Sequence, residues 1–86
     1  MRFFLSGNLL RFSSFQREVT VDATTVAEGI DVLIAQHPGL AQVLLDGAHN
    51  VRGVHKLFID GEPLDSLDSP VGDDTEIAIV TAIAGG

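Results

Sequence analysis

The apolar run at residues 77–83 is the feature that most constrains how this chain can fold. Nearly every side chain in the run is apolar, which is typical of a strand with neighbours on both sides rather than an edge strand. Pro70, Gly72 and Asp73 belong to a turn-forming stretch just before it. The sequence therefore predicts a sheet in which this last strand is an interior member.

Four other segments have the pattern of strands. Residues 1–6 and 17–22 alternate in polarity, and their short separation favours a hairpin. Residues 54–59 predict a third strand, and Asp60-Gly61 after it is a strong hairpin signal. Residues 62–64 can form only a short edge strand, because Pro63 cannot donate to a ladder.

One main helix is predicted between the second and third strands. Thr25 and Glu28 have the spacing of a capping box, which places the start of the helix there. One face of the helix has a mainly apolar stripe, which consists of Val26, Ile30, Leu33, Ile34 and His37. Pro38-Gly39 ends the helix. Gly29 lies inside this helix and weakens it by about 1 kcal/mol relative to alanine. A short helical turn is expected around Leu40, Val43 and Leu44.

This order of elements predicts an α+β fold. The economical arrangement is a mixed sheet of four or five strands with the main helix packed on one face, since crossover connections are right-handed. Residues 1–86 are expected to form a single small domain. The order of the strands within the sheet does not follow from periodicity alone.

Composition excludes several classes of function. The formal net charge is −7, which disfavours binding to nucleic acid. This acidity predicts either attraction of a basic protein partner or no more than solubility. No apolar stretch reaches the roughly 20 residues that a membrane span needs, so a soluble cytoplasmic protein is expected. There is no cysteine, so disulfides and thiolate chemistry are absent.

The polar residues do not form a recognisable catalytic or metal-binding motif. His37, His49 and His55 lack metal-site spacing and are interpreted as helix-end, loop and strand-surface residues. The acidic stretch at residues 60–68 lacks the pattern of a calcium loop, and Ser66 and Ser69 have no nearby base. We therefore expect no bound metal or cofactor and no enzymatic activity of the chain itself.

The end of the sequence, Gly85-Gly86, offers a different kind of chemistry. Glycine has no Cβ, so a partner's walls can approach this backbone closely, as in a narrow tunnel. Extended, residues 82–86 reach roughly 16 to 18 Å beyond the last strand. A carboxylate at Gly86 could attack the α-phosphorus of ATP and form an acyl-adenylate. The alternative is a frayed end with no function.

Several stretches together resemble the ubiquitin-like sulfur-carrier proteins, the family of the thiamin-biosynthesis carrier and the small subunit of molybdopterin synthase. They are residues 2–5 (RFFL), 25–26 (TV), 57–62 (LFIDGE), 71–77 (VGDDTEI) and 84–86 (AGG). The resemblance implies a β-grasp fold whose first and last strands are parallel neighbours, followed by a flexible tail of about residues 82–86.

The resemblance also implies a function and its partners. In such families an E1-like adenylating enzyme activates the terminal glycine with ATP, and a sulfur donor converts it to a thiocarboxylate. A synthase then takes the sulfur into a cofactor such as molybdopterin or thiamin, into cysteine, or into another metabolite. A metalloprotease removes residues after Gly-Gly in some members.

Carried over by position, the reactive group is the carboxylate of Gly86. The expected partner-binding residues are Ser6, Val80, Ala82, Ile83, Ala84 and Gly85. Molybdopterin-type carriers often have prolines before the tail and aromatic residues where this chain has Ser6 and Val80, which indicates a different docking enzyme. A protein modifier that forms isopeptide bonds through Gly86, and an acidic binding module, remain as alternatives.

Overall fold

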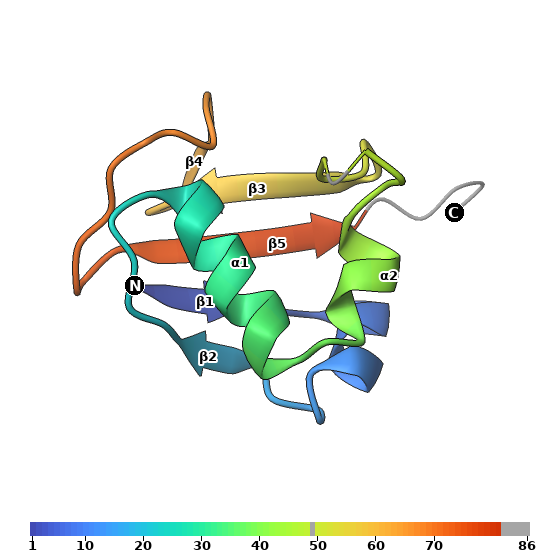
Figure 1. Cartoon of the computed structure of the whole chain (residues 1–86). Helices are drawn as coiled ribbons and strands as arrows, with labels where there is room; N and C mark the ends of the chain where they lie inside the picture. The colour runs from blue at the N-terminus through green and yellow to red at the C-terminus, as the bar shows by residue number, and fades with distance from the viewer. Residues whose placement is uncertain (49, 82–86) are drawn as a thin grey trace.

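The computed structural model describes residues 1–48 and 50–81. Within these residues the chain forms five strands, two α-helices and one 3₁₀ helix (Figure 1). In chain order they are β1 (Arg2–Phe4), η1 (Gly7–Phe12), β2 (Glu18–Thr20), α1 (Val26–Gln36), α2 (Leu40–Leu44), β3 (His55–Ile59), β4 (Glu62–Pro63) and β5 (Glu76–Thr81). The predicted strands and helices are confirmed, and η1 is an addition that the sequence patterns did not indicate.

The strands form one mixed sheet in the order β2-β1-β5-β3-β4. β5 is central, as predicted: it pairs in parallel with β1 and antiparallel with β3. The β1–β2 and β3–β4 pairs are the predicted antiparallel neighbours. Figure 1 shows α1 crossing one face of this sheet, which leaves the other face open. This is the β-grasp fold.

The hydrophobic core lies between the sheet and α1. In β5, Ile77 and Ile79 are 0% and 2% exposed, whereas Glu76 and Val80 point to the open face and are exposed. Burial of each such side chain contributes roughly 1.5 to 3 kcal/mol. The buried apolar residues are Met1, Phe3, Leu5, Leu9, Val19, Val21, Val26, Ile30, Leu33, Leu40, Leu44, Leu45, Ile77 and Ile79.

The predicted capping box starts α1. The Glu28 N–H donates to Thr25 Oγ1 at 3.2 Å, and Glu28 Oε1 accepts from the Thr24 N–H at 3.0 Å. The Glu28 side chain thus reaches back to the backbone amide of Thr24, the residue before the N-cap Thr25. The helix ends at Gln36 with His37 as its C-cap, in agreement with the interpretation of that histidine as a helix-end residue.

Gly29 allows the start of the chain to pack directly on α1. A Cβ at this position would collide with the Met1 side chain and lie 3.4 Å from the Phe3 ring. The low helix propensity of glycine is therefore accompanied by a close contact between helix and sheet. This contact is the tertiary packing that offsets the local weakness.

The link between the first two strands is longer and more ordered than a tight hairpin turn, because residues 7–12 form η1. Leu9, 2% exposed, anchors this helix in the core. After it, Ser13 is fully buried and its hydroxyl donates to backbone carbonyls, at 3.0 Å in the case of Gln16. Ser14 and Phe15 both have positive φ, and Phe15 is 72% exposed. The link between η1 and β2 thus holds an aromatic ring in solvent.

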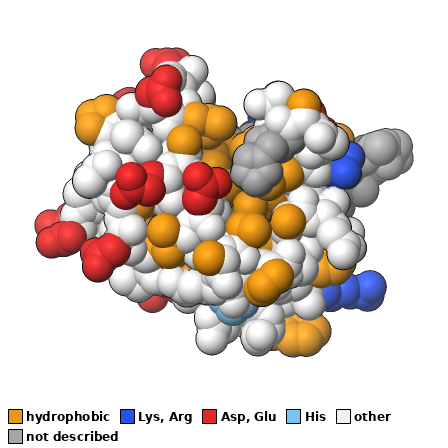
Figure 2. Space-filling view, in the orientation of Figure 1, with side chains coloured by type: hydrophobic (Ala, Val, Ile, Leu, Met, Phe, Trp, Pro, Cys, Tyr) orange, Lys and Arg blue, Asp and Glu red, His pale blue; other side chains and the backbone are white. Residues whose placement is uncertain are grey.

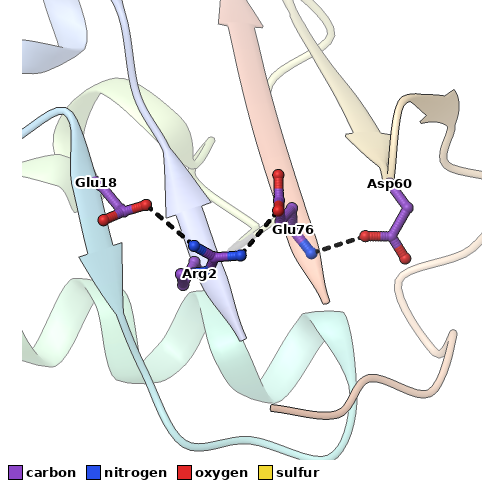
Figure 3. Close-up of polar contacts among 4 residues, drawn as sticks. All are labelled: Arg2, Glu18, Asp60 and Glu76. Carbon is purple, nitrogen blue, oxygen red and sulfur yellow. Dashed lines mark hydrogen bonds and ion pairs between the residues drawn. The ribbon is translucent and has the colours of Figure 1, made fainter. Parts of the chain in front are cut away.

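An ionic network crosses the open face near the start of β5 (Figure 3). Arg2 Nη2 lies 2.8 Å from Glu76 Oε2, and Arg2 Nη1 lies 3.5 Å from Glu18 Oε1. The Glu76 N–H donates to Asp60 Oδ1 at 2.9 Å. These side chains are over a third exposed, so each ion pair contributes at most about 1 kcal/mol. The network joins β2, β1 and β5 with the end of β3.

Candidate functional site

The predicted reactive group lies outside the described residues. This applies to Gly86 and to the predicted partner-binding residues Ala82, Ile83, Ala84 and Gly85. The chain enters that segment directly after Thr81, the last residue of β5. The described part of the site is therefore the boundary of the sheet that lies across the strand ends, on the side where β5 ends. We call this boundary the tail edge.

The other two predicted partner-binding residues, Ser6 and Val80, come together at the tail edge. Both line a small cavity of about 240 Å³ with Gly7, Asn8 and Thr81. They meet because β1 runs parallel to β5, so the chain leaving β1 passes beside the end of β5. Val80 is 46% exposed. An apolar side chain is thus open to a partner next to the start of the tail.

An apolar row leads across the open face of the sheet beside Val80. The registers place Phe4 opposite Ala78, Ala78 opposite Phe58, and Phe58 opposite Pro63. The row therefore crosses four adjacent strands. Phe4, Ala78 and Phe58 are half-buried and Pro63 is exposed. Apolar side chains left open together in this way are found at protein interaction sites. With Val80 the row forms an apolar surface continuous with the tail edge.

His55 lies inside the fold, so its interpretation as a strand-surface residue is wrong. It is 7% exposed, not a strand-surface residue, and both ring nitrogens have partners. Nε2 lies 2.6 Å from the Val43 carbonyl oxygen, and Nδ1 lies 2.9 Å from Thr81 Oγ1. Alternation along β3 could have revealed this, because His55 shares the inward face with Leu57 and Ile59.

The hydrogen bonds of His55 define its tautomer. A carbonyl oxygen can only accept, so Nε2 carries the proton and donates to Val43. In the neutral ring Nδ1 then accepts from the Thr81 hydroxyl. One imidazole thus connects the last residue of β5 to α2, and the start of the tail has a fixed anchor inside the fold.

The loop after α2 is organised by Asp46. Its carboxylate accepts hydrogen bonds from the N–H groups of Ala48 at 2.8 Å and Asn50 at 3.0 Å. These bonds, that from Asn50 foremost, lower the pKa of Asp46 below its ordinary value. His49, the predicted loop histidine, lies outside the described residues. Asp46 therefore acts as a structural acceptor that shapes this loop.

A larger groove of about 570 Å³ lies beside β3 and β4. Its lining includes Val51, His55, Leu57, Leu64, Asp65 and Ser66. The Ser66 hydroxyl accepts a hydrogen bond from the Asp68 N–H at 3.1 Å, and His55 is bonded at both nitrogens. In residues 1–48 and 50–81, no three His, Asp or Glu side chains are grouped so that they could hold a metal ion. The groove offers mainly apolar contact.

Solved structures share the fold over nearly the whole chain. SAMP1 from Haloferax volcanii superposes with a TM-score of 0.84 at 23% identity, covering 99% of this chain and 97% of that one. A chain of the BexX/CysO complex from Amycolatopsis orientalis gives 0.84 at 22% identity, with 99% and 98% covered. A chain of the complex of subunits 1 and 2 of the molybdopterin-converting factor from Helicobacter pylori gives 0.65 at 18% identity, with 99% and 96% covered.

Sequence comparison identifies the family. No curated protein sequence matches the chain, and none of its described helices has the length and apolar character needed to cross a membrane. The model of the ThiS family, however, matches residues 10–86, which include the Gly85-Gly86 end. The chain therefore belongs to the ThiS family.

Proposed function

We propose that this protein is a sulfur carrier whose reactive group is the carboxylate of Gly86, once Gly86 is the terminal residue. A carboxylate oxygen attacks the α-phosphorus of ATP, pyrophosphate leaves, and an acyl-adenylate forms. A sulfur nucleophile then attacks the acyl carbon and AMP leaves with its oxygen. With hydrosulfide as the nucleophile the product is the thiocarboxylate, and no reductant is needed.

The observation that carries this proposal is the family match through Gly86, directly beyond the central strand. The surface around the end of β5 supports it, because Val80 is exposed beside the start of the tail and the neighbouring apolar row is partly exposed. In this proposal the fold supplies docking and presentation, and partner enzymes supply the catalysis. The chain is therefore a co-substrate rather than an enzyme, and ATP binds to the activating enzyme.

The proposal requires several partners. They are an E1-like adenylating enzyme, a sulfur donor, a synthase that accepts the sulfur and, where residues follow Gly86, a metalloprotease. The acceptor would be a precursor of a cofactor such as molybdopterin or thiamin, of cysteine, or of another sulfur-containing metabolite. The proposed compartment is the cytoplasm, where ATP is available.

The test is an intact-mass measurement after incubation with ATP, the cognate adenylating enzyme and sodium sulfide. We expect the wild-type chain to gain the mass difference between one sulfur and one oxygen. A variant lacking Gly86 should keep its original mass. An unchanged wild-type mass with active adenylating enzyme would refute the carrier function.

A protein modifier is the second candidate, favoured by the structural likeness to the small archaeal modifier protein SAMP1. It would share the adenylation step but transfer Gly86 to a lysine amine, with loss of AMP. Conjugates that disappear on deletion of Gly86 would identify this function. The sequence has one lysine, Lys56, so self-conjugation is restricted to that side chain. An acidic binding module, the third alternative, should keep its partner affinity without Gly85-Gly86.

A further inference from the structure

The charges of this acidic protein are separated along the direction of the strands. β5 runs from the edge that contains Glu76 to the tail edge, and β1 is parallel to it, while β2 and β3 run the other way. Residues that follow β1 or precede β2 and β3 therefore gather at the tail edge. Those that precede β5 or follow β2 and β3 gather at the opposite edge.

Four of the five basic residues lie at the tail edge. Arg17 precedes β2, and its carbonyl accepts from Leu5 N–H at 2.8 Å, just after β1. Arg11 is in η1, whose first residues line the cavity with Val80. Arg52 precedes β3, and Lys56 pairs across the sheet with Val80.

Most of the acidic residues lie at the opposite edge or at the adjoining start of α1. They are Asp22, Glu28, Asp60, Glu62, Asp68, Asp73, Asp74 and Glu76. The fifth basic residue, Arg2, is also there and is bonded to Glu18 and Glu76. Figure 2 shows this separation: most visible Asp and Glu side chains lie to the left and top, and the larger groups of Lys and Arg side chains lie to the right, where β5 ends.

A partner at the tail edge therefore encounters a basic surface, although the whole chain is acidic. β5 has six residues, which separates the two edges by about 20 Å. The Debye length at physiological ionic strength is about 8 Å, so the distant carboxylates are largely screened there. The acidic side chains nearest this edge are Glu18 at the start of β2, Asp46, and Asp65 after β4. Four cations oppose these three carboxylates.

The arrangement of the cations favours a partner whose carboxylates form an extended rim over a ligand with a single phosphate group. Arg11 and Arg17 lie on the β1–β2 side of β5, whereas Arg52 and Lys56 lie on the β3 side. The side chains of Arg11, Arg17 and Lys56 are exposed. They therefore surround the start of the tail rather than converge in one pocket.

We propose that the tail edge docks on a protein surface whose carboxylates surround the channel that receives residues 82–86. The acidic opposite edge then orients the molecule by repulsion, so that the tail enters first. This inference rests on the proposed function and specifies the chemistry of the partner's surface. Net charge alone would indicate a basic partner. The distribution of charge instead indicates an acidic partner surface at the tail edge.

The test compares two sets of charge-neutralising substitutions in ATP–pyrophosphate exchange catalysed by the cognate adenylating enzyme. The tail-edge variant carries Arg11→Gln, Arg17→Gln and Lys56→Gln. We expect its KM to rise about tenfold at low ionic strength, with kcat little changed and a weaker salt dependence of kcat/KM. The opposite-edge control, Asp73→Asn with Asp74→Asn, should leave KM within about twofold. An unchanged KM of the tail-edge variant, or a larger loss in the control, would overturn the inference.

A second measurement examines the surface charge without the enzyme. Amide signals are recorded by NMR with a carboxylate-bearing and an ammonium-bearing nitroxide as soluble probes. We expect the anionic probe to broaden Ser6, Gly53 and Thr81 more than the cationic probe does, and the reverse at Gly61 and Gly72. Equal broadening at both edges would overturn the inference, whereas absence of exchange with the wild-type chain would refute only the proposed function.

Discussion

The Nδ1 atom of His55 lies 2.9 Å from Thr81 Oγ1, at the last described residue of the central strand. The opposite ring nitrogen lies 2.6 Å from the Val43 carbonyl oxygen of α2. The end of β5 is therefore held by a side chain that is itself fixed at both ends. The fold thus provides a rigid base next to the segment that we propose to be activated.

Replacing Thr81 tests this anchor. Thr81→Val keeps the shape but leaves Nδ1 without its hydroxyl partner, so we expect a loss of about 1 kcal/mol in the free energy of unfolding. For a domain of this size the Tm should fall by roughly 4 to 8 °C. Thr81→Ser keeps the hydroxyl and should lose clearly less. Equal loss in the two variants, measured by thermal and urea unfolding, would contradict the role of this hydrogen bond.

The docking role of Val80 can be separated from stability. Val80 is exposed on the open face opposite Lys56, so Val80→Glu gains an opposite-charge neighbour and should change the free energy of unfolding by less than about 1 kcal/mol. The carboxylate would disturb apolar docking, and we expect KM for the adenylating enzyme to rise about tenfold or more. Thr20→Glu, at the distant edge of the same face, is the matched control. A similar KM for both variants would exclude Val80 from the interface.

Two phenylalanines should respond oppositely to truncation. Phe3 is fully buried, so Phe3→Ala should cost about 3 to 5 kcal/mol in urea unfolding. Phe15 is 72% exposed, and Phe15→Ala should stay within about 0.5 kcal/mol. A large loss in the second variant would show that the Phe15 ring packs on the fold instead of facing solvent.

Asp46 gives a prediction with a defined pH dependence. Its pKa is lowered in the folded state, chiefly by the Asn50 N–H and then by the Ala48 N–H. The stabilisation is therefore complete above the unfolded-state pKa and is lost as pH falls through the folded-state pKa. The stability difference between wild type and Asp46→Ala should be largest near neutral pH and shrink below about pH 4.

The control for this prediction is Asp73→Ala, in the exposed turn before β5. Its stability difference from wild type should stay small at every pH. Urea unfolding measured from neutral to acid pH distinguishes the two variants. A difference for Asp46→Ala that grows toward acid pH would contradict the assigned hydrogen bonds.

The local signals in the sequence predicted the fold because each rests on short-range chemistry. Thr25 and Glu28 are three residues apart, so their capping box is visible in the sequence. The apolar run beginning at Ile77 likewise required a central strand. The pairing of β1 with β5 joins distant parts of the chain, and it was expected from the family resemblance rather than from periodicity.

Features that depend on tertiary contacts were not predicted. The position of η1 follows from the burial of Leu9 in the core, and an isolated stretch of six residues gives little indication of it. His55 was interpreted as a surface residue because its partners, Val43 and Thr81, are distant in sequence. The separation of charge can be recognised only when the strand directions are known. Composition gives a single net charge and does not show where the charged residues lie.

The central claim is that the Gly86 carboxylate is the group that becomes activated. Its most direct test compares two chains that differ only at that group, the free acid and the Gly86 carboxamide made by semisynthesis. ATP–pyrophosphate exchange by the cognate adenylating enzyme is measured with each. We expect exchange with the acid and none with the amide; exchange with both, or with neither, would contradict the claim.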